Sequence, residues 1–324
     1  MYRRKRAAPS RRPQWLLPAA LALAAVLAAA ALLAAFLGGA PGGESPSPSP
    51  LPASAPPPTP TPDPTPTPSP DPAQELLAEM SLYEKVCQLL VVKPSAITGV
   101  SRVTAAGETT RAALERYPVA GLLYDDTNLV TMEQTKTMLA NVQSYSKIPH
   151  ILTSDEEGGR VNYKDQGIDK AAENARTIAG DLAACGFNMD LAPVADVWSN
   201  RSNTVIGDRA YSDDFDEAAQ LVAASVGGFH QGGVACTLKH FPGHGDTSAD
   251  SHYGSVYVYK TLDELRGAEL VPFRAGIEAG ADAVMLGHLV MAGIDEQPAL
   301  FSHAVVTGLL LEELGFDGVV ITDS

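Results

Sequence analysis

The sequence predicts an α/β fold for residues 74 to 324: a (β/α)8 TIM-type barrel that is apparently truncated after its seventh strand. Short apolar runs in this region are continuous rather than alternating, and helical segments separate them, as in parallel strands buried on both faces. Polar residues end several runs, and the active sites of such barrels lie at the carboxyl ends of the strands. A doubly wound open sheet is the alternative, but no Gly-rich phosphate loop follows the first run.

Seven runs are interpreted as strands, in the order QLLVV (88–92), AGLLYDD (120–126), HILTSDE (150–156), FNMDLAP (187–193), ACTLKH (235–240), DAVMLGH (282–288) and GVVITD (318–323). Helix starts are predicted at Ser81, Thr131 and Thr261. In each case Glu or Gln follows three residues later, as in a capping box. The last run ends at Asp323, next to the final residue, whereas an eight-fold barrel requires an eighth strand. A barrel that lacks a strand has two unpaired edges, so the barrel is interpreted as incomplete at its C-terminus.

The first 73 residues are not expected to be globular. Residues 1 to 14 are basic, and residues 15 to 37 carry no charge and are long enough to span a bilayer. The positive charges before this span orient the N-terminus toward the cytoplasm. We therefore expect a transmembrane signal anchor with an extracytoplasmic catalytic domain; a cleaved signal peptide, and hence a secreted protein, is the alternative. Residues 38 to 73 are rich in Pro, Ser and Thr, which favours an extended disordered linker.

The net charge argues against nucleic-acid binding, and the cysteines argue against a disulfide-based fold. The chain has 23 basic and 38 acidic residues, a formal net charge of −15, so nucleic acid is not an expected partner. Its three cysteines, Cys87, Cys185 and Cys236, are flanked by apolar or small residues. This context favours buried thiols over a disulfide framework, although one disulfide remains open.

The stretch KHFPGHGDTSADSH (239–252) concentrates chemically active side chains. His240 and His244 are spaced like zinc ligands on a helix, but Pro242 and the neighbouring glycines break such a helix. No HExxH motif or Cys-x-x-Cys pair occurs, so neither a metal nor another cofactor is expected. Instead, Asp250 and His252 are placed in a polar loop and can form a carboxylate–imidazole dyad that transfers protons at neutral pH.

The same stretch resembles the signature of the bacterial β-N-acetylglucosaminidases of glycoside hydrolase family 3. The resemblance extends over residues 74 to 324 and includes SDEEGGRV (154–161), NMDLAPVADV (188–197), IGDRAYSDD (206–214) and ELGFDGVVITDS (313–324). It implies that Asp323 is the nucleophile, that His252 is the general acid/base and that Asp250 is its partner. It also implies that four residues hold the terminal sugar: Asp155, Arg209, Lys239 and His240. His288 has a family-like position near the site, with a core-lining role as the alternative.

Two glutamates near the site are given no catalytic role, and one position differs from the family pattern. Glu156 and Glu157 are expected to contact water, neighbouring basic residues or the following Gly-rich turn. Many family members carry a second arginine where this sequence has Tyr163, a neutral residue. Contacts on that side of the sugar are therefore expected to differ.

The resemblance implies an exo-acting, retaining β-N-acetylglucosaminidase that acts on cell-wall or chitin-type oligosaccharides through a covalent intermediate. A histidine acid/base repels phosphate less than a carboxylate does, so phosphorolysis is one alternative. A β-glucosidase-like activity is a second alternative. A tethered carbohydrate-binding protein, inactive because of truncation, is the third. The expected partners are an N-acetylglucosamine-containing glycan and, through the N-terminal helix, a membrane.

Overall fold

The structure is a computed structural model that describes residues 71 to 158, 166 to 248, 254 and 256 to 324. The predicted membrane helix and nearly all of the predicted linker lie outside these residues. Within them, no helix is both long and apolar enough to cross a membrane. The first described helix, α2 (Pro72–Glu79), begins two residues before the predicted boundary of the barrel, because Asp71 caps it by accepting a hydrogen bond from the Ala73 amide.

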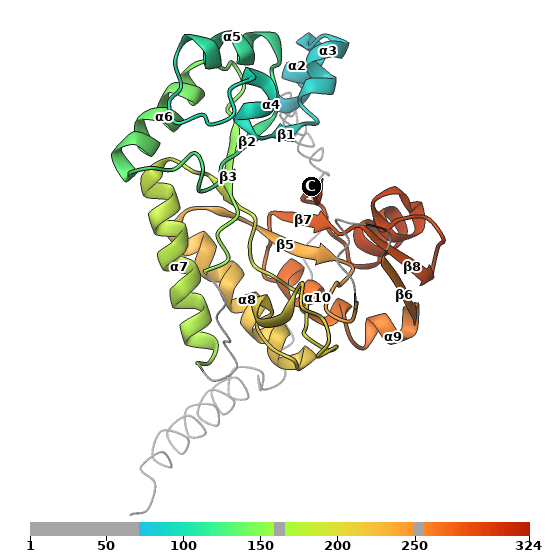
Figure 1. The fold of residues 1–324 in the computed structure, drawn as a ribbon. Helices are drawn as coiled ribbons and strands as arrows, with labels where there is room; N and C mark the ends of the chain where they lie inside the picture. Colours follow the sequence, from blue (N-terminus) through green and yellow to red (C-terminus); the bar gives the residue numbers. More distant parts are fainter. Residues whose placement is uncertain (1–70, 159–165, 249–253, 255) are drawn as a thin grey trace, which may run out of the picture. The chain divides into compact units, whose positions relative to one another are not determined.

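The core of the fold is a sheet of seven parallel strands in chain order. These are β1 (Val91–Val92), β2 (Gly121–Leu123), β3 (Ile151–Ser154), β4 (Met189–Asp190), β5 (Ala235–Phe241), β7 (Ala283–Leu286) and β9 (Val319–Thr322). Each predicted run overlaps one of them, and β5 extends one residue beyond its run, so the α/β class and the parallel arrangement are confirmed. The sheet is curled, and β1 and β9 form its two edges (Figure 1). The described chain is therefore an open, curled sheet that corresponds to part of a barrel.

Helices connect the strands of the large sheet, and three of them begin immediately after Ser81, Thr131 and Thr261, the three predicted positions. The longer ones are α5 (Glu108–Arg116), α6 (Met132–Ser144), α7 (Ile168–Cys185), α8 (Phe215–Gly232) and α10 (Leu270–Glu278); the shorter ones are α3 (Leu82–Cys87), α4 (Pro94–Thr98) and α9 (Leu262–Arg266), with a π-helix at Ala304–Glu313. Ser81 and Thr261 form complete capping boxes with Glu84 and Glu264. Thr131 caps α6 but forms no complete box, because the Gln134 side chain accepts from the Val130 amide instead.

A second, two-stranded parallel sheet was not predicted. It consists of β6 (Val256–Thr261) and β8 (Leu289–Gly293). In β6, Val256 and Val258 are buried while Tyr257 and Tyr259 are exposed. Successive side chains of β6 thus point alternately into the protein and into solvent. The exposed positions carry tyrosine, which is uncharged and favours strands as valine does. The sequence consequently lacks the polar–apolar alternation that identifies a half-buried strand.

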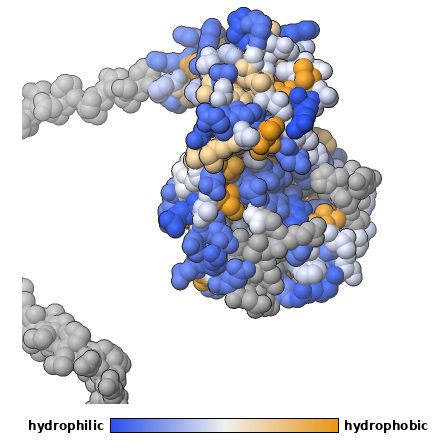
Figure 2. Space-filling view, turned by 60° about the vertical axis from the view of Figure 1, so that its left-hand side comes forward, coloured by the Kyte–Doolittle hydropathy of each residue, from blue (hydrophilic) through white to orange (hydrophobic). Residues whose placement is uncertain are grey.

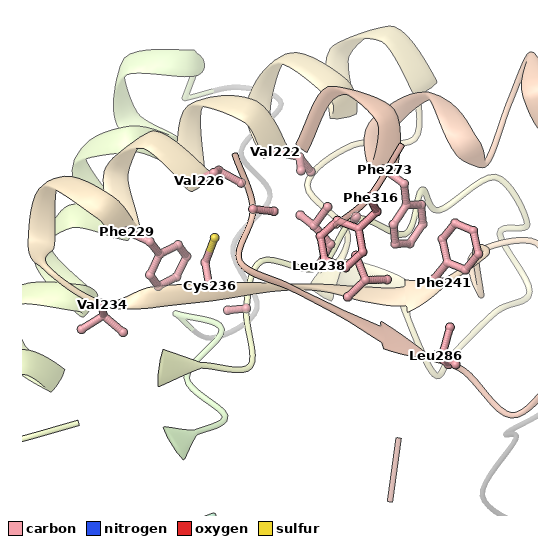
Figure 3. Close-up of a cluster of buried hydrophobic side chains, with 14 of the residues drawn as sticks. Val222, Val226, Phe229, Val234, Cys236, Leu238, Phe241, Phe273, Leu286 and Phe316 are labelled. Atoms are coloured by element: carbon pink, nitrogen blue, oxygen red, sulfur yellow. The ribbon is translucent and has the colours of Figure 1, made fainter. Parts of the chain in front are cut away.

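The core packs helix α8 against strand β5. Val222, Val226 and Phe229 of α8 face Cys236 and Leu238 of β5 (Figure 3). All five side chains are buried, and none of the three cysteines forms a disulfide. The face seen in Figure 2 is largely hydrophilic, with hydrophobic side chains in small separate patches. Burial of apolar surface between the sheet and its helices thus fixes where the strands end, and therefore where the candidate site lies.

Candidate active site

A pocket of about 430 Å³ opens at the carboxyl ends of the strands. Its lining contains five residues to which the sequence assigned roles: Asp155, Arg209, Lys239, His240 and Asp323. They come from four different parts of the chain, and the parallel sheet brings them together. A larger hollow of about 540 Å³ beside α2 and α3 contains none of these residues, so volume alone does not locate the chemistry.

A network of ion pairs organises one side of this pocket. Lys239 is almost fully buried, and its Nζ binds Oε1 of Glu157 at 2.7 Å and also the Asp155 carboxylate. Glu157 in turn receives two hydrogen bonds from Arg209, from Nε at 2.9 Å and from Nη2 at 2.6 Å. Burial raises the pKa of the Glu157 carboxyl, but Arg209 and Lys239 outweigh this effect and lower the pKa to about 2. Glu157 is therefore an anion that holds both cations in place.

A second network orients the residues after β5. The buried Asp196 accepts hydrogen bonds on Oδ2 from His240 Nδ1 at 2.7 Å and on Oδ1 from the His244 amide at 2.6 Å. Burial raises the pKa of the Asp196 carboxyl, but the two histidines more than compensate and lower it. Because Nδ1 of His240 faces Asp196, Nε2 is the ring atom that can meet a ligand in the pocket. The Lys239–His240 peptide is cis, as are those before Pro193 and Pro242.

The remaining members of the stretch have structural contacts. Nδ1 of His244 lies 2.7 Å from the Thr247 hydroxyl, and Asp246 forms an ion pair with Lys260 at 3.1 Å. His240 belongs to strand β5 and His244 lies in the loop after it, so the two do not share a helix, as expected. Asp250 and His252, the predicted dyad, lie outside the described residues, as does Tyr163.

Asp323 follows β9, next to the end of β7. Its amide donates to the Leu286 carbonyl at 3.0 Å, and Oδ1 accepts from the Ser324 amide at 2.8 Å. His288 lies beside it, with Nε2 3.3 Å from the Asp323 carbonyl oxygen. His288 thus contacts the backbone of the predicted nucleophile and is partly exposed rather than a core residue.

One buried acid in this region was not singled out from the sequence. Asp190 at the end of β4 is fully buried, and its Oδ1 accepts from the Glu156 amide at 2.9 Å. Among the described residues its Oδ2 has no hydrogen-bond partner. Burial raises the pKa of this carboxyl to about 8, so the acid is largely protonated at neutral pH. The available signal was an aspartate inside an otherwise apolar run, MDLAP (189–193).

Comparison with known proteins assigns the family. The model of the glycosyl hydrolase family 3 N-terminal domain matches residues 81 to 324, most of the chain. The chain belongs to glycosyl hydrolase family 3. Family 3 is a family of glycosidases, so the resemblance found in the sequence is confirmed. The match begins seven residues after the predicted start of the barrel.

Individual family 3 relatives agree with this assignment. A β-hexosaminidase of Stenotrophomonas maltophilia is 37% identical over 231 residues, which cover 65% of this chain and 68% of the relative. A family 3 β-N-acetylglucosaminidase from a Paenibacillus species has a similar structure, with a TM-score of 0.70 and 35% identity, covering 75% of this chain. The present chain spans about half of that protein (49%). Native NagZ from Neisseria gonorrhoeae matches with a TM-score of 0.66 and 29% identity, over 72% of this chain and 73% of its own.

Proposed function

We propose that this family 3 chain carries the active site of an exo-acting, retaining β-N-acetylglucosaminidase that removes terminal N-acetylglucosamine from cell-wall or chitin-type oligosaccharides. The observation that supports this most directly is the pocket in which Asp323 shares a lining with Lys239, Arg209 and Asp155. Such a pocket offers one carboxylate for covalent chemistry and several charged groups for sugar hydroxyls. The substrate class is inferred from the relatives, a β-hexosaminidase and a β-N-acetylglucosaminidase.

In the proposed mechanism, the Asp323 carboxylate attacks the anomeric carbon and forms a covalent glycosyl–enzyme bond. His252 gives its proton to the departing glycosidic oxygen, and Asp250 orients the imidazole and stabilises its cation. A water molecule then loses a proton to His252 and attacks the anomeric carbon, which releases Asp323. Two displacements retain the anomeric configuration.

The ion-pair network has a distinct proposed task. Lys239 and Arg209 donate hydrogen bonds to sugar hydroxyls, Asp155 accepts them, and Nε2 of His240 contributes another contact. Glu157 and Asp196 hold these groups in position without touching the sugar, because their oxygens already accept bonds from the sugar-binding residues. Preorganised donors lower the cost of ordering the site when the substrate binds.

The test uses the full chain and an aryl β-N-acetylglucosaminide whose coloured aglycone is released on cleavage. Asp323→Asn and His252→Ala are each expected to lower kcat by at least about 1,000-fold, since each removes a group that acts in the transition state. Asp317→Asn is the matched control, because Asp317 is exposed and lies outside the pocket lining. Proton NMR of the first product formed is expected to show the β-anomer.

Three outcomes would contradict the proposal. The first is near-normal turnover in either variant, and the second is an α-anomer as the first product. The third is the absence of cleavage by the wild-type chain despite binding of N-acetylglucosamine, which would favour the carbohydrate-binding alternative. Repeating the assay with phosphate and detecting the sugar phosphate distinguishes phosphorolysis from hydrolysis.

A further inference from the structure

Three potential metal ligands meet at the end of the sheet opposite the sugar pocket. They are His230 near the end of α8, Cys236 at the start of β5 and Asp282 immediately before β7. One ligand atom from each lies within 4.8 Å of the others. His230 Nε2 is 2.8 Å from Asp282 Oδ2, and the same oxygen accepts the Cys236 amide at 2.9 Å.

The cluster is separate from the active site. Cys236 and His240 both belong to β5, four residues apart, and a strand rises about 3.3 Å per residue. Their Cα atoms are therefore roughly 13 Å apart along the strand. Cys236 lies between β5 and α8, beside Phe229 (Figure 3). A ligand bound here would not touch the glycan.

We propose that His230, Cys236 and Asp282 bind one zinc ion that stabilises this end of the fold. A thiolate, an imidazole and a carboxylate form a donor set that suits zinc and not magnesium or calcium, which prefer oxygen ligands. The side chains of His230 and Asp282 are 38% and 39% exposed. Zinc thus has an entry path, and water can occupy a fourth position.

All three ligands have to adjust: the Cys236 sulfur lies within 4.8 Å of the other two ligand atoms, and a zinc–sulfur bond of about 2.3 Å requires roughly 3.6 Å. Zinc bonds of about 2.0 to 2.1 Å to nitrogen and oxygen place tetrahedral ligands roughly 3.3 Å apart, so the His230–Asp282 pair has to open by about 0.5 Å. Asp282 is already oriented by the Cys236 amide, and its carbonyl accepts from the Val319 amide at 3.0 Å. Such outer contacts fix ligand orientation in metal sites. The ion would link α8, β5 and β7.

The Cys236 thiol changes protonation state on binding. Its burial, together with the neighbouring Asp282 carboxylate, raises the pKa of the thiol to about 12, so it is protonated in the absence of metal. Zinc replaces that proton, which passes to solvent, and the thiolate becomes a ligand. No oxidation or reduction takes place.

Cobalt(II) provides a spectroscopic test on the full chain after dialysis against a chelator. Binding at this site is expected to produce an intense near-ultraviolet thiolate-to-cobalt absorption band that saturates at one ion per chain and disappears when zinc is added. Cys236→Ala should abolish the band and weaken zinc binding by at least about 100-fold. Cys87→Ala should retain it, because Cys87 is also buried but lies outside the cluster.

Thermal unfolding provides a second readout. Zinc is expected to raise the Tm of the wild-type chain and of Cys87→Ala, but not that of Cys236→Ala or Asp282→Asn. Each variant is compared with and without zinc, so a lower starting stability does not obscure the result. The proposal is overturned if no thiolate band forms, if the band survives in Cys236→Ala, or if zinc raises the Tm of that variant equally. None of these measurements depends on glycosidase activity.

Discussion

Glu157 shows at the scale of single residues how one anion determines the shape of a binding pocket. It accepts hydrogen bonds from Arg209 and lies 2.7 Å from the Lys239 ammonium, so two cations depend on one carboxylate. Its neighbour Glu156 is exposed, and its side chain accepts only from the Gly158 amide among the bonds that the structure describes. The two adjacent glutamates therefore differ in their contacts, although the sequence analysis gave the same expectation for both.

Replacing Glu157 with Gln tests this difference. The change leaves Arg209 without its anion and Lys239 with Asp155 alone, so the free energy of unfolding is expected to fall by about 3 kcal/mol. The KM for the aryl glycoside should rise about tenfold or more, because Arg209 and Lys239 lose their fixed positions. Glu156→Gln is the matched control and should change both quantities little. Equal effects of the two substitutions would show that Glu157 has no special role.

Asp190 predicts a pH dependence of stability. Its pKa is about 8 in the folded protein against an ordinary 3.8, so the unfolded chain loses this proton first as pH rises. The contribution to stability is therefore full below about pH 4 and declines up to about pH 8. Asp190→Asn removes this decline. Between about pH 5 and 7, the stability of the wild type relative to this variant should fall by up to about 1.4 kcal/mol per pH unit.

Chemical denaturation at a series of pH values measures this slope. Asp181→Asn serves as the control, because Asp181 is an exposed helical residue. If Asp190→Asn and the wild type show parallel pH profiles, Asp190 is ionised in the folded protein and the inferred protonation is wrong.

At the scale of elements, helices α7 and α8 approach closely along a seam of small residues. A Cβ atom added to Gly228 would lie 2.4 Å from the Ala172 carbonyl and 2.8 Å from the Ala175 Cβ. A Cβ added to the preceding residue, Gly227, would meet nothing within 4 Å. Helix α8 thus has no room for a side chain at Gly228 but has room for one at Gly227.

This contrast predicts opposite effects of two matched substitutions. Gly228→Ala should destabilise the fold by about 2 kcal/mol or more, because the helices have to move apart. Gly227→Ala should be neutral or stabilise by up to about 1 kcal/mol, because alanine favours a helix more than glycine does. Urea denaturation of both variants checks the prediction, which fails if the two shifts have the same sign and size.

The strands of the large sheet were predicted and β6 was not, because the two differ in how their side chains are exposed. The five inner strands of the large sheet are largely buried, and all seven strands appear in the sequence as continuous apolar runs, although the edge strands β1 and β9 are partly exposed. Strand β6 is buried on one face only, and its exposed residues are tyrosines rather than charged residues. The two tyrosine rings stack with centroids 6.2 Å apart, because residues i and i+2 of a strand lie on the same face.

At the scale of the whole molecule, the N-terminal segment predicts where the protein acts. We propose that residues 15 to 37 anchor the chain in a membrane and that the linker holds the catalytic domain outside the cytoplasm. Full-length protein should remain in carbonate-washed membranes, whereas a chain lacking residues 1 to 37 should be soluble. A full-length protein that is released from the membrane with a shortened N-terminus would instead indicate a cleaved signal peptide.

Local sequence pattern was sufficient for the seven strands of the large sheet, the helix starts at Ser81, Thr131 and Thr261, the family, and the candidate residues of the pocket. Tertiary structure decided which of these residues meet. Glu157 pairs with Arg209, 52 residues away, and Asp196 pairs with His240, 44 residues away. Periodicity and capping involve neighbours in the chain, whereas these contacts depend on strand order and register, which the packing of the whole sheet fixes.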